Sequence, residues 1–86
     1  DAPADFVERP DGSFLVEGSV PIGTLAERFG IDLGTEPRDY ETVSGLVLAE
    51  LERLPTAGDS LTWQGLVIEV VDMDGRRIDK LLIRRE

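Results

Sequence analysis

Three strand-like segments in the last third of the chain constrain the fold more than any other feature. Apolar residues recur through Ser60–Trp63, Leu66–Val71 and Arg76–Arg84. Gln64-Gly65 separates the first two segments, and Asp74-Gly75 is a strong two-residue hairpin signal between the second and the third. Strands joined by such short turns pair as antiparallel neighbours, so we expect a three-stranded meander here.

One strand and two helices precede this meander. Ser13–Val20 is predicted as a strand, and Pro21–Phe29 is predicted as a helix because apolar residues recur in it at helical spacing. Thr42 is expected to cap a second helix, which runs to about Arg53 and ends before Pro55. The apolar stripe of this second helix comprises Val43, Leu46, Val47, Leu51 and Leu54.

The order of these elements predicts the fold class. A β-α-α-β-β-β order, with the helices together before the meander, is typical of an α+β domain. We expect a largely antiparallel four-stranded sheet with both helices on one of its faces. The chain has 86 residues, which is the size of one domain. Residues 1–11 contain two prolines and several acids and are predicted to be a linker, so the domain itself would span residues 12–86.

The last strand has a break in its apolar pattern. Strict alternation would put Lys80 and Leu82 on the same face as Ile78, whereas Leu81 and Ile83 would lie on the opposite face. An extra residue near position 79 or 80 would bring Ile78, Leu81 and Ile83 onto one face. We therefore expect a β-bulge there, with Lys80 turned toward solvent and Leu82 on the outer face of the sheet, available for contact with a neighbouring domain or subunit.

Charge and hydropathy exclude several kinds of partner. Nine basic residues stand against 18 acidic ones, which gives a net charge of −9. Such a charge repels the phosphates of nucleic acids, so no nucleic-acid partner is expected. No segment approaches the roughly 20 apolar residues of a membrane-spanning helix, so this fragment is not expected to insert into a membrane.

Catalytic and nucleotide-binding motifs are absent from the sequence. The chain contains no histidine and no cysteine, which rules out a Ser-His-Asp triad and a Cys-His pair. It also lacks the glycine-rich loops that hold phosphate groups. We therefore predict that the domain is not an enzyme and needs no cofactor.

An acidic loop between the two helices is the one candidate metal site. Its members are Asp32, Glu36, Asp39 and Glu41. Carboxylates on a flexible loop can hold Mg²⁺ or Ca²⁺ weakly through their oxygen atoms. The alternative interpretation is a solvated acidic loop with no bound ion.

Six segments, in the same order and spacing, resemble a known family. They are Asp11–Ser19, Pro21–Gly30, Tyr40–Leu46, Leu54–Asp59, Val67–Val71 and Arg76–Ile78. Together they are similar to the CorC/HlyC transporter-associated domain, and the resemblance covers roughly residues 11–84. The positions that define these segments are Gly12, Gly18, Tyr40, Thr42, Gly45, Pro55, Gly58, Asp59 and Ile78.

The resemblance implies a place in a larger protein. Such domains follow a membrane domain and a pair of CBS domains in hemolysin-like proteins linked to magnesium and cobalt efflux. The chain would then lie on the cytoplasmic side of the cell membrane, as an accessory module that modulates ion transport through contacts between domains or subunits. The CBS and membrane domains would be its partners, and the resemblance also allows a homodimer. The family lends no catalytic residues.

A second hypothesis is that the domain senses a ligand. The acidic loop favours a divalent cation. The resemblance also implies a fold similar to a subdomain of FAD-binding oxidases, which suggests flavin adenine dinucleotide. The absence of a phosphate-binding glycine loop argues against this dinucleotide.

Overall fold

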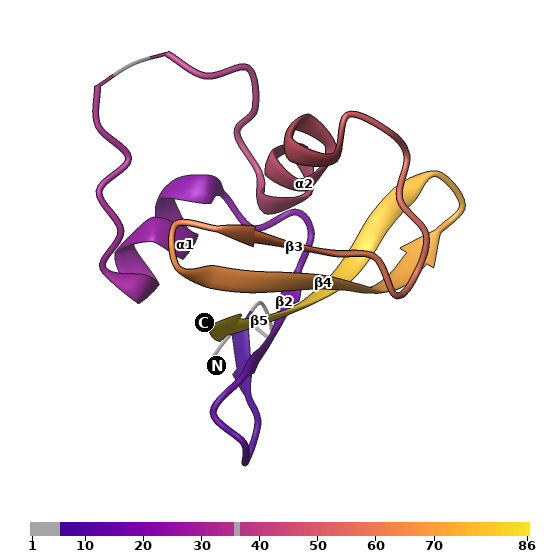
Figure 1. Cartoon of the computed structure of the whole chain (residues 1–86), viewed down its shortest axis with the longest axis horizontal. Coiled ribbons are helices and arrows are strands. Elements are labelled where there is room, and N and C mark those ends of the chain that lie inside the picture. Colours follow the sequence, from indigo (N-terminus) through magenta and orange to yellow (C-terminus); the bar gives the residue numbers. More distant parts are fainter. Residues whose placement is uncertain (1–5, 36) are drawn as a thin grey trace.

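A computed structural model describes residues 6–35 and 37–86 of the chain. In this part of the chain, two helices and five strands follow one another as drawn in Figure 1. They are β1 (Phe6–Glu8), β2 (Phe14–Glu17), α1 (Ile22–Phe29), α2 (Val43–Leu51), β3 (Ser60–Trp63), β4 (Leu66–Asp74) and β5 (Arg77–Arg85).

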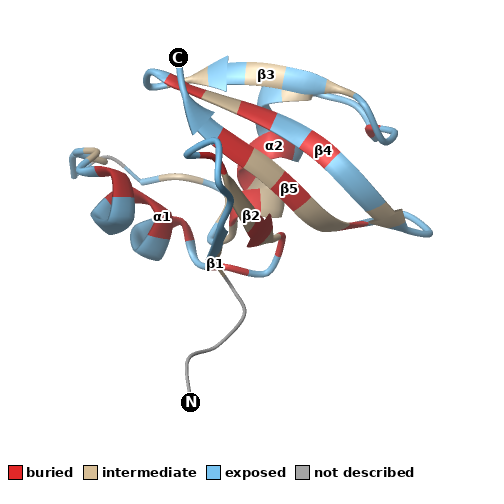
Figure 2. Ribbon diagram, turned by 90° about the horizontal axis from the view of Figure 1, so that it is seen from below, coloured by how far each residue is buried: buried red, intermediate tan, exposed pale blue. Residues whose placement is uncertain are grey.

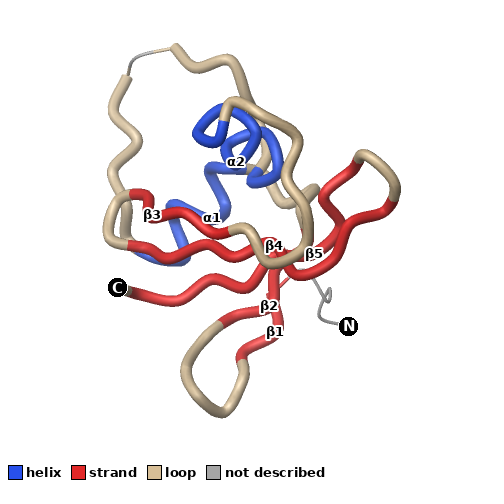
Figure 3. The backbone as a smooth tube through the Cα atoms, turned by 45° about the vertical axis from the view of Figure 1, so that its right-hand side comes forward, coloured by secondary structure: helices blue, strands red, loops and turns tan. Residues whose placement is uncertain are grey.

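The strands form one antiparallel sheet in the order β1-β2-β5-β4-β3. Both helices lie on the same side of this sheet, as the tube in Figure 3 shows. The predicted α+β class and the placement of both helices on one face are confirmed. The core lies between the helices and the sheet, and its fully buried side chains include Val16, Leu25, Val43, Leu46, Val47, Leu66, Ile68, Leu81 and Ile83.

The sheet has one strand more than the sequence predicts. Residues 6–8 fall within the segment expected to be a linker, but they form β1, in which Phe6 pairs with Val16. The turn that follows places Gly12 in the left-handed region, with φ at 89°. Its N–H donates a hydrogen bond of 2.9 Å to the carbonyl oxygen of Arg9. Gly12 was predicted correctly as a turn residue. The strand before this turn, β1, was missed because its three residues are too few to show an alternating pattern.

The predicted β-bulge in β5 is confirmed. Asp72 of β4 pairs with Lys80, and the next residue, Met73, pairs with Ile78. Asp79 is therefore the extra residue on β5. A second irregularity, at Val71, shifts the register on the β4 side. As a result Ile78, Leu81 and Ile83 are all buried, whereas Lys80 and Leu82 are only half-buried.

Both helices end in a left-handed residue, but the second ends earlier than expected. Gly30 closes α1 with φ at 69°. Glu52 closes α2 with φ at 57°, so this helix stops at Leu51 instead of near Arg53. Leu54 therefore does not continue the apolar stripe and is 46% exposed, which contradicts the prediction. Among the described residues, no helix has both the length and the apolar character needed to cross a membrane.

An aromatic cluster fixes α1 to the first two strands. The ring of Phe14 meets the rings of Phe6 and Phe29 edge to face, with centroid distances of 6.3 and 5.4 Å. The guanidinium of Arg28 lies 5.2 Å from the ring centroid of Phe6 and 5.5 Å from that of Phe14. Edge-to-face pairs and cation–π contacts of this kind are each worth about 1 kcal/mol.

Candidate functional site

The segment after β2 passes so close to β5 and α2 that only glycine fits at position 18. The N–H of Gly18 donates to the carbonyl oxygen of Asp79 over 2.9 Å. Its own carbonyl oxygen accepts from the N–H of Ser44, also over 2.9 Å. A side chain at position 18 would overlap the carbonyl oxygen of Ile78. This one residue therefore connects the β5 bulge to the first turn of α2, and we call the arrangement the Gly18 junction.

The start of α2 completes the Gly18 junction. Thr42 is the N-cap, and its hydroxyl accepts a hydrogen bond of 3.1 Å from the N–H of Gly45. Gly45 is needed because a Cβ there would lie 2.8 Å from the Cβ of Tyr40. The N–H of Val43 donates to the carbonyl oxygen of Val20 over 2.9 Å. The N–H groups of residues 43, 44 and 45 thus all have partners within the protein, so they are not available to bind a phosphate.

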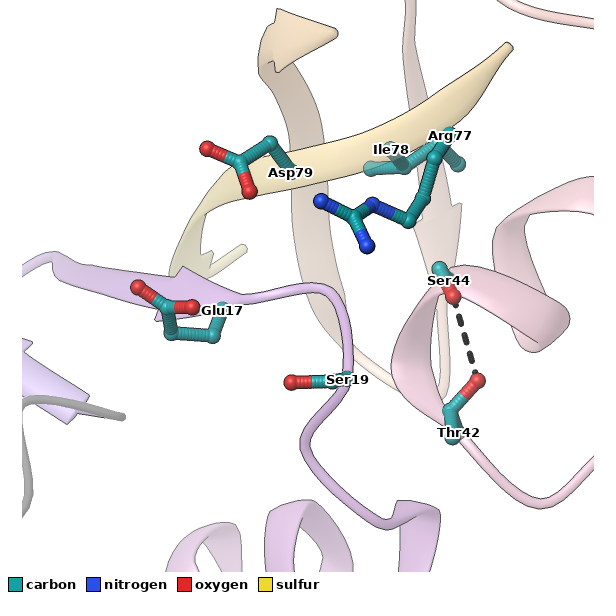
Figure 4. Close-up of a pocket in the computed structure, with 7 residues that line it drawn as sticks. All are labelled: Glu17, Ser19, Thr42, Ser44, Arg77, Ile78 and Asp79. Carbon is teal, nitrogen blue, oxygen red and sulfur yellow. Dashed lines mark hydrogen bonds between the residues drawn. The ribbon is translucent and has the colours of Figure 1, made fainter. Parts of the chain in front are cut away.

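A surface hollow of about 270 Å³ lies beside this junction (Figure 4). Its polar lining comes from β2 and the turn after it, from the start of α2 and from β5. The lining residues are Glu17, Ser19, Thr42, Ser44, Arg77, Ile78 and Asp79. Sequence patterns did not bring these side chains together, because the predicted bulge near position 79 does not indicate that β5 lies beside β2.

The charges around the hollow are paired with one another. Lys80 lies next to it, and its Nζ is 3.1 Å from Oδ2 of Asp79 and 3.4 Å from Oε2 of Glu17. The hydrogen bond between Lys80 and Asp79 lowers the pKa of Asp79 and raises the pKa of Lys80. The Arg77 guanidinium is 2.9 Å from the carboxylate of Asp74. The acidic and basic side chains around the hollow thus lie in ion pairs with one another.

Two of the hydroxyl groups that line the hollow are in contact with each other. The Thr42 and Ser44 hydroxyl oxygens are 3.1 Å apart, as the dashed line in Figure 4 shows. Within the described residues, every buried side-chain nitrogen or oxygen has a hydrogen-bond partner. The Gly18 junction therefore has the features of a structural joint, in which polar groups hold three chain segments together.

The Pro55–Asp59 segment forms a second joint, between α2 and the β3–β4 hairpin. One carboxylate oxygen of Asp59 accepts 2.9 Å hydrogen bonds from Nη1 of Arg53 and from the N–H of Thr56. Both bonds lower the pKa of Asp59, which falls to about 2, and the bond from Arg53 has the larger effect. Gly58 has φ at 102°, and its N–H donates to the carbonyl oxygen of Val70 over 2.8 Å. Pro55 is fully buried.

The acidic loop is not gathered into a metal site among the residues that the structure describes. Asp32, Asp39 and Glu41 are exposed, and Glu36 lies outside the described residues. Asp32 accepts a 2.8 Å hydrogen bond from the N–H of Gly34, which is a local turn bond. In residues 6–35 and 37–86, no group of three or more acidic side chains lies close enough together to hold a metal ion. Metal binding by this loop stays a prediction.

Two curated relatives are similar to this chain over most of its length. A UPF0053 protein of Synechocystis is 41% identical over 82 residues. The polyamine export protein of Salmonella typhimurium is 38% identical over 80 residues. In both comparisons the alignment covers 93% of this chain but 18% of the relative. The chain therefore spans less than a fifth of the length of these relatives.

Solved structures of similar fold cover nearly the whole chain. A transporter associated domain from a Xylella fastidiosa hemolysin is 42% identical, with a TM-score of 0.85 over 98% of both chains. The same domain has been solved in complex with Mg²⁺ and Mn²⁺, with a TM-score of 0.86 over 96% of this chain and 99% of that one. A region associated with a putative Mg²⁺ and Co²⁺ transporter of Neisseria meningitidis is 26% identical, with a TM-score of 0.86 over 95% of this chain and 99% of that one.

The family model agrees with these similarities. The model of the transporter associated domain CorC_HlyC matches residues 7–86, from β1 through the last strand. This match includes both joints, and the resemblance expected from the six sequence segments is confirmed. The chain belongs to the CorC_HlyC transporter associated domain family.

Proposed function

We propose that this chain is a non-catalytic accessory domain that modulates cation transport from the cytoplasmic side of the cell membrane. The family match over residues 7–86 carries this proposal. Relatives of known length are several times longer than the chain, which covers 18% of them. The transport pathway itself would then be formed by other parts of a CorC/HlyC-type membrane protein, and this domain would act on those parts.

The geometry of the two joints favours action through surface contacts. The family positions Gly18, Thr42 and Gly45 all serve to hold the backbone together, as Gly58 and Asp59 do at the second joint. The hollow beside Gly18 contains paired charges. A rigid domain whose polar groups are already satisfied transmits force well between neighbours. We propose the CBS domains and the membrane domain of the parent protein as those neighbours.

The cargo that we propose is a multivalent cation. Magnesium and cobalt efflux is the transport type of the family resemblance, and the Neisseria relative is associated with a putative transporter of Mg²⁺ and Co²⁺. The Salmonella relative is a polyamine export protein. Divalent metals and polyamines both carry more than one positive charge, so we propose cargo of this class.

Deletion of residues 7–86 from the parent membrane protein tests this function. We expect cells with the deletion to retain more of the cargo or to lose control of its export, while the amount of parent protein in the membrane is unchanged. Cellular Mg²⁺, Co²⁺ and polyamine contents are the readouts. Export indistinguishable from that of the intact protein, at equal membrane levels, would contradict the proposal.

A second candidate function is the sensing of a divalent cation. The observation in its favour is that a relative with 42% identity has been solved in complex with Mg²⁺ and Mn²⁺. In this chain we propose the acidic loop as the binding segment, with Asp32, Glu36, Asp39 and Glu41 as ligands. Exposed carboxylates on a loop bind such ions weakly, so we expect a dissociation constant on the order of 1 mM.

We propose that flavin adenine dinucleotide is not a ligand, although the fold is likened to part of the FAD-binding oxidases. A dinucleotide pyrophosphate needs free backbone N–H groups at a helix start. In α2 the N–H groups of Val43, Ser44 and Gly45 have partners inside the protein. Titration of the chain with the dinucleotide should leave flavin fluorescence unchanged, and a saturable quench at micromolar protein would refute this expectation.

A further inference from the structure

The carboxyl end of α2 exposes leucine side chains that the rest of the described chain does not cover. Leu48 is 39% exposed, and Leu54, three residues after the helix, is 46% exposed. Because each residue of an α-helix turns by about 100°, Leu48 lies almost opposite the fully buried Leu46 and points away from the core. In the part of the chain that the structure describes, no helix or strand lies on this side of α2 (Figures 1 and 3).

The other helix, α1, has no such side chain, although it packs on the same face of the sheet. Its exposed residues are Gly23, Thr24, Glu27 and Arg28, and they form the pale blue outer side of α1 in Figure 2. A helix with one apolar and one polar side is typical of the surface of a globular protein. By contrast, α2 is apolar over more of its circumference than the sheet covers, which favours contact with a further segment.

Two carboxylates lie at the same end of α2. Glu50 and Glu52 are both exposed, and the last turn of this helix contains no basic residue, whereas α1 has Arg28 in its last turn. The next residue, Arg53, is already 2.9 Å from the carboxylate of Asp59. The carboxyl end of a helix carries a partial negative charge, so carboxylates there are unfavourable, and a cation supplied from outside would be stabilising.

We call Leu48, Glu50, Glu52 and Leu54 the α2 end, and we propose that it binds an amphipathic segment rich in lysine and arginine in the cytoplasmic part of the parent's membrane domain. The two leucines contact the apolar side of such a segment, and the two glutamates pair with its basic side chains. Cytoplasmic segments next to membrane-spanning helices carry an excess of lysine and arginine. The same carboxylates repel nucleic acids and anionic lipid headgroups, so a basic protein segment is the partner that this surface favours.

This inference rests on the proposed function, because it names the membrane domain of the parent protein as the neighbour. Its test uses the chain alone and measures only the binding of a peptide. Absence of peptide binding would therefore leave the role in transport standing. Unchanged export after deletion of residues 7–86 would leave the peptide-binding surface in place but would remove the membrane domain as its partner.

Titration with a basic amphipathic peptide is the first measurement. The probe is a helical peptide of about 18 leucine and lysine residues with its leucines along one face. A peptide of the same composition, shuffled so that no face is apolar, controls for charge alone. We expect the amphipathic peptide to shift the backbone amide NMR signals of residues 48–54, and the shuffled peptide to bind at least about fivefold more weakly. No shift at millimolar peptide, shifts spread over the sheet, or equal binding of both peptides would overturn the proposal.

Two pairs of variants separate the α2 end from the rest of the surface. Leu48→Gln should weaken binding of the amphipathic peptide roughly fivefold, and Val71→Gln on β4 is the matched control, because Val71 is 42% exposed. Glu52→Gln should weaken binding roughly threefold, and Glu69→Gln, at an exposed glutamate of β4, is its control. Circular dichroism verifies that each variant is folded. Losses as large in the β4 variants as in the α2 variants would refute the α2 end as the docking surface.

Discussion

The Gly18 junction and the acidic loop lie on either side of the same helix, α1, and they differ in almost every physical respect. At the junction, the N–H and C=O groups of Gly18 both bond to distant segments, and no side chain fits. In the loop, Asp32, Asp39 and Glu41 are exposed, and the Asp32 carboxylate bonds only to its own turn among the described contacts. The backbone of the Gly18 junction is held by several contacts at once, whereas the side chains of the acidic loop are exposed to solvent.

This difference determines how well each region should tolerate substitution. A backbone that is bonded on both sides cannot accept even a methyl group, so the residue type at position 18 is set by packing. An exposed carboxylate can be replaced without disturbing its neighbours, so its replacement should cost little stability. Substitutions in the two regions should therefore have effects of very different size.

The largest effect is expected from Gly18→Ala. The added Cβ would overlap the carbonyl oxygen of Ile78, which belongs to the backbone and cannot turn aside. The displacement would also strain the hydrogen bond between Gly18 and Asp79. We expect a loss of about 3 kcal/mol in the free energy of unfolding, measured by urea denaturation.

Gly23→Ala is the matched control for this substitution. Gly23 lies within α1, and a Cβ there would meet no atom within 4 Å. Because alanine favours the helix more than glycine does, this variant should gain about 0.5–1 kcal/mol. If both glycine variants lose stability equally, the contact between a Cβ at position 18 and the Ile78 carbonyl oxygen is not the reason that glycine is needed there.

A smaller effect, which depends on pH, is expected at the second joint. The folded pKa of Asp59 is about 2, below the ordinary value of 3.8 for an aspartate. Its charged form is therefore favoured by folding, and that contribution is fully present above about pH 4 and is lost as the pH falls toward 2. Asp59→Asn should lower the melting temperature at pH 7, and the difference from the wild-type chain should shrink between pH 4 and pH 2.

Asp74→Asn is the matched control, because it removes an ordinary surface ion pair, whereas Asp59→Asn removes the ion pair of the second joint. Asp74 lies 2.9 Å from Arg77, the same distance as Asp59 from Arg53, but its side chain is 68% exposed, compared with 24% for Asp59. Exposed pairs of this kind contribute little to stability. The melting temperature of Asp74→Asn should match that of the wild-type chain at every pH, and a drop equal to that of Asp59→Asn would remove the distinction.

The acidic loop should respond in binding and not in stability. We expect Asp39→Asn to leave the melting temperature unchanged, because the side chain is exposed. If this loop holds a divalent cation, the same variant should weaken the binding of Mg²⁺ and Mn²⁺, measured by calorimetry. Binding that is equally strong in the variant would place the cation elsewhere on the domain.

The smallest effect is expected from removal of metal. The core between helices and sheet is formed by apolar side chains, which pack together without an ion. Treatment with a chelator should therefore leave the circular dichroism spectrum and the melting temperature unchanged. A spectrum typical of an unfolded chain would contradict this expectation and would show that folding depends on a bound ion.

Much of the fold could be predicted because local signals agreed with it. The bulge followed from the apolar phases of Ile78, Leu81 and Ile83, and all three are buried. The fifth strand was missed because residues 6–8 are too few to show a period. The end of α2 was placed too late because a left-handed glutamate, Glu52, closes the helix where glycine is usual.

The candidate site was harder to predict than the fold. The sequence singled out Gly18, Thr42, Gly45 and Ile78 individually, but nothing in their spacing shows that they meet. Their meeting depends on which strand lies beside β2, and β5 is separated from β2 by 59 residues, positions 18–76. The residues that line the hollow with them, such as Glu17 and Asp79, are ordinary surface acids in the sequence.

The position of the last strand has a consequence for the synthesis of this protein. β5 lies in the middle of the sheet, between β2 and β4, although it is the final element of the domain to leave the ribosome. Until residues 77–85 emerge, β2 has one side unpaired and the helices have no complete surface to cover. The sheet is therefore completed late in synthesis, and a nascent chain that stops before residue 77 would expose the unpaired edges of β2 and β4.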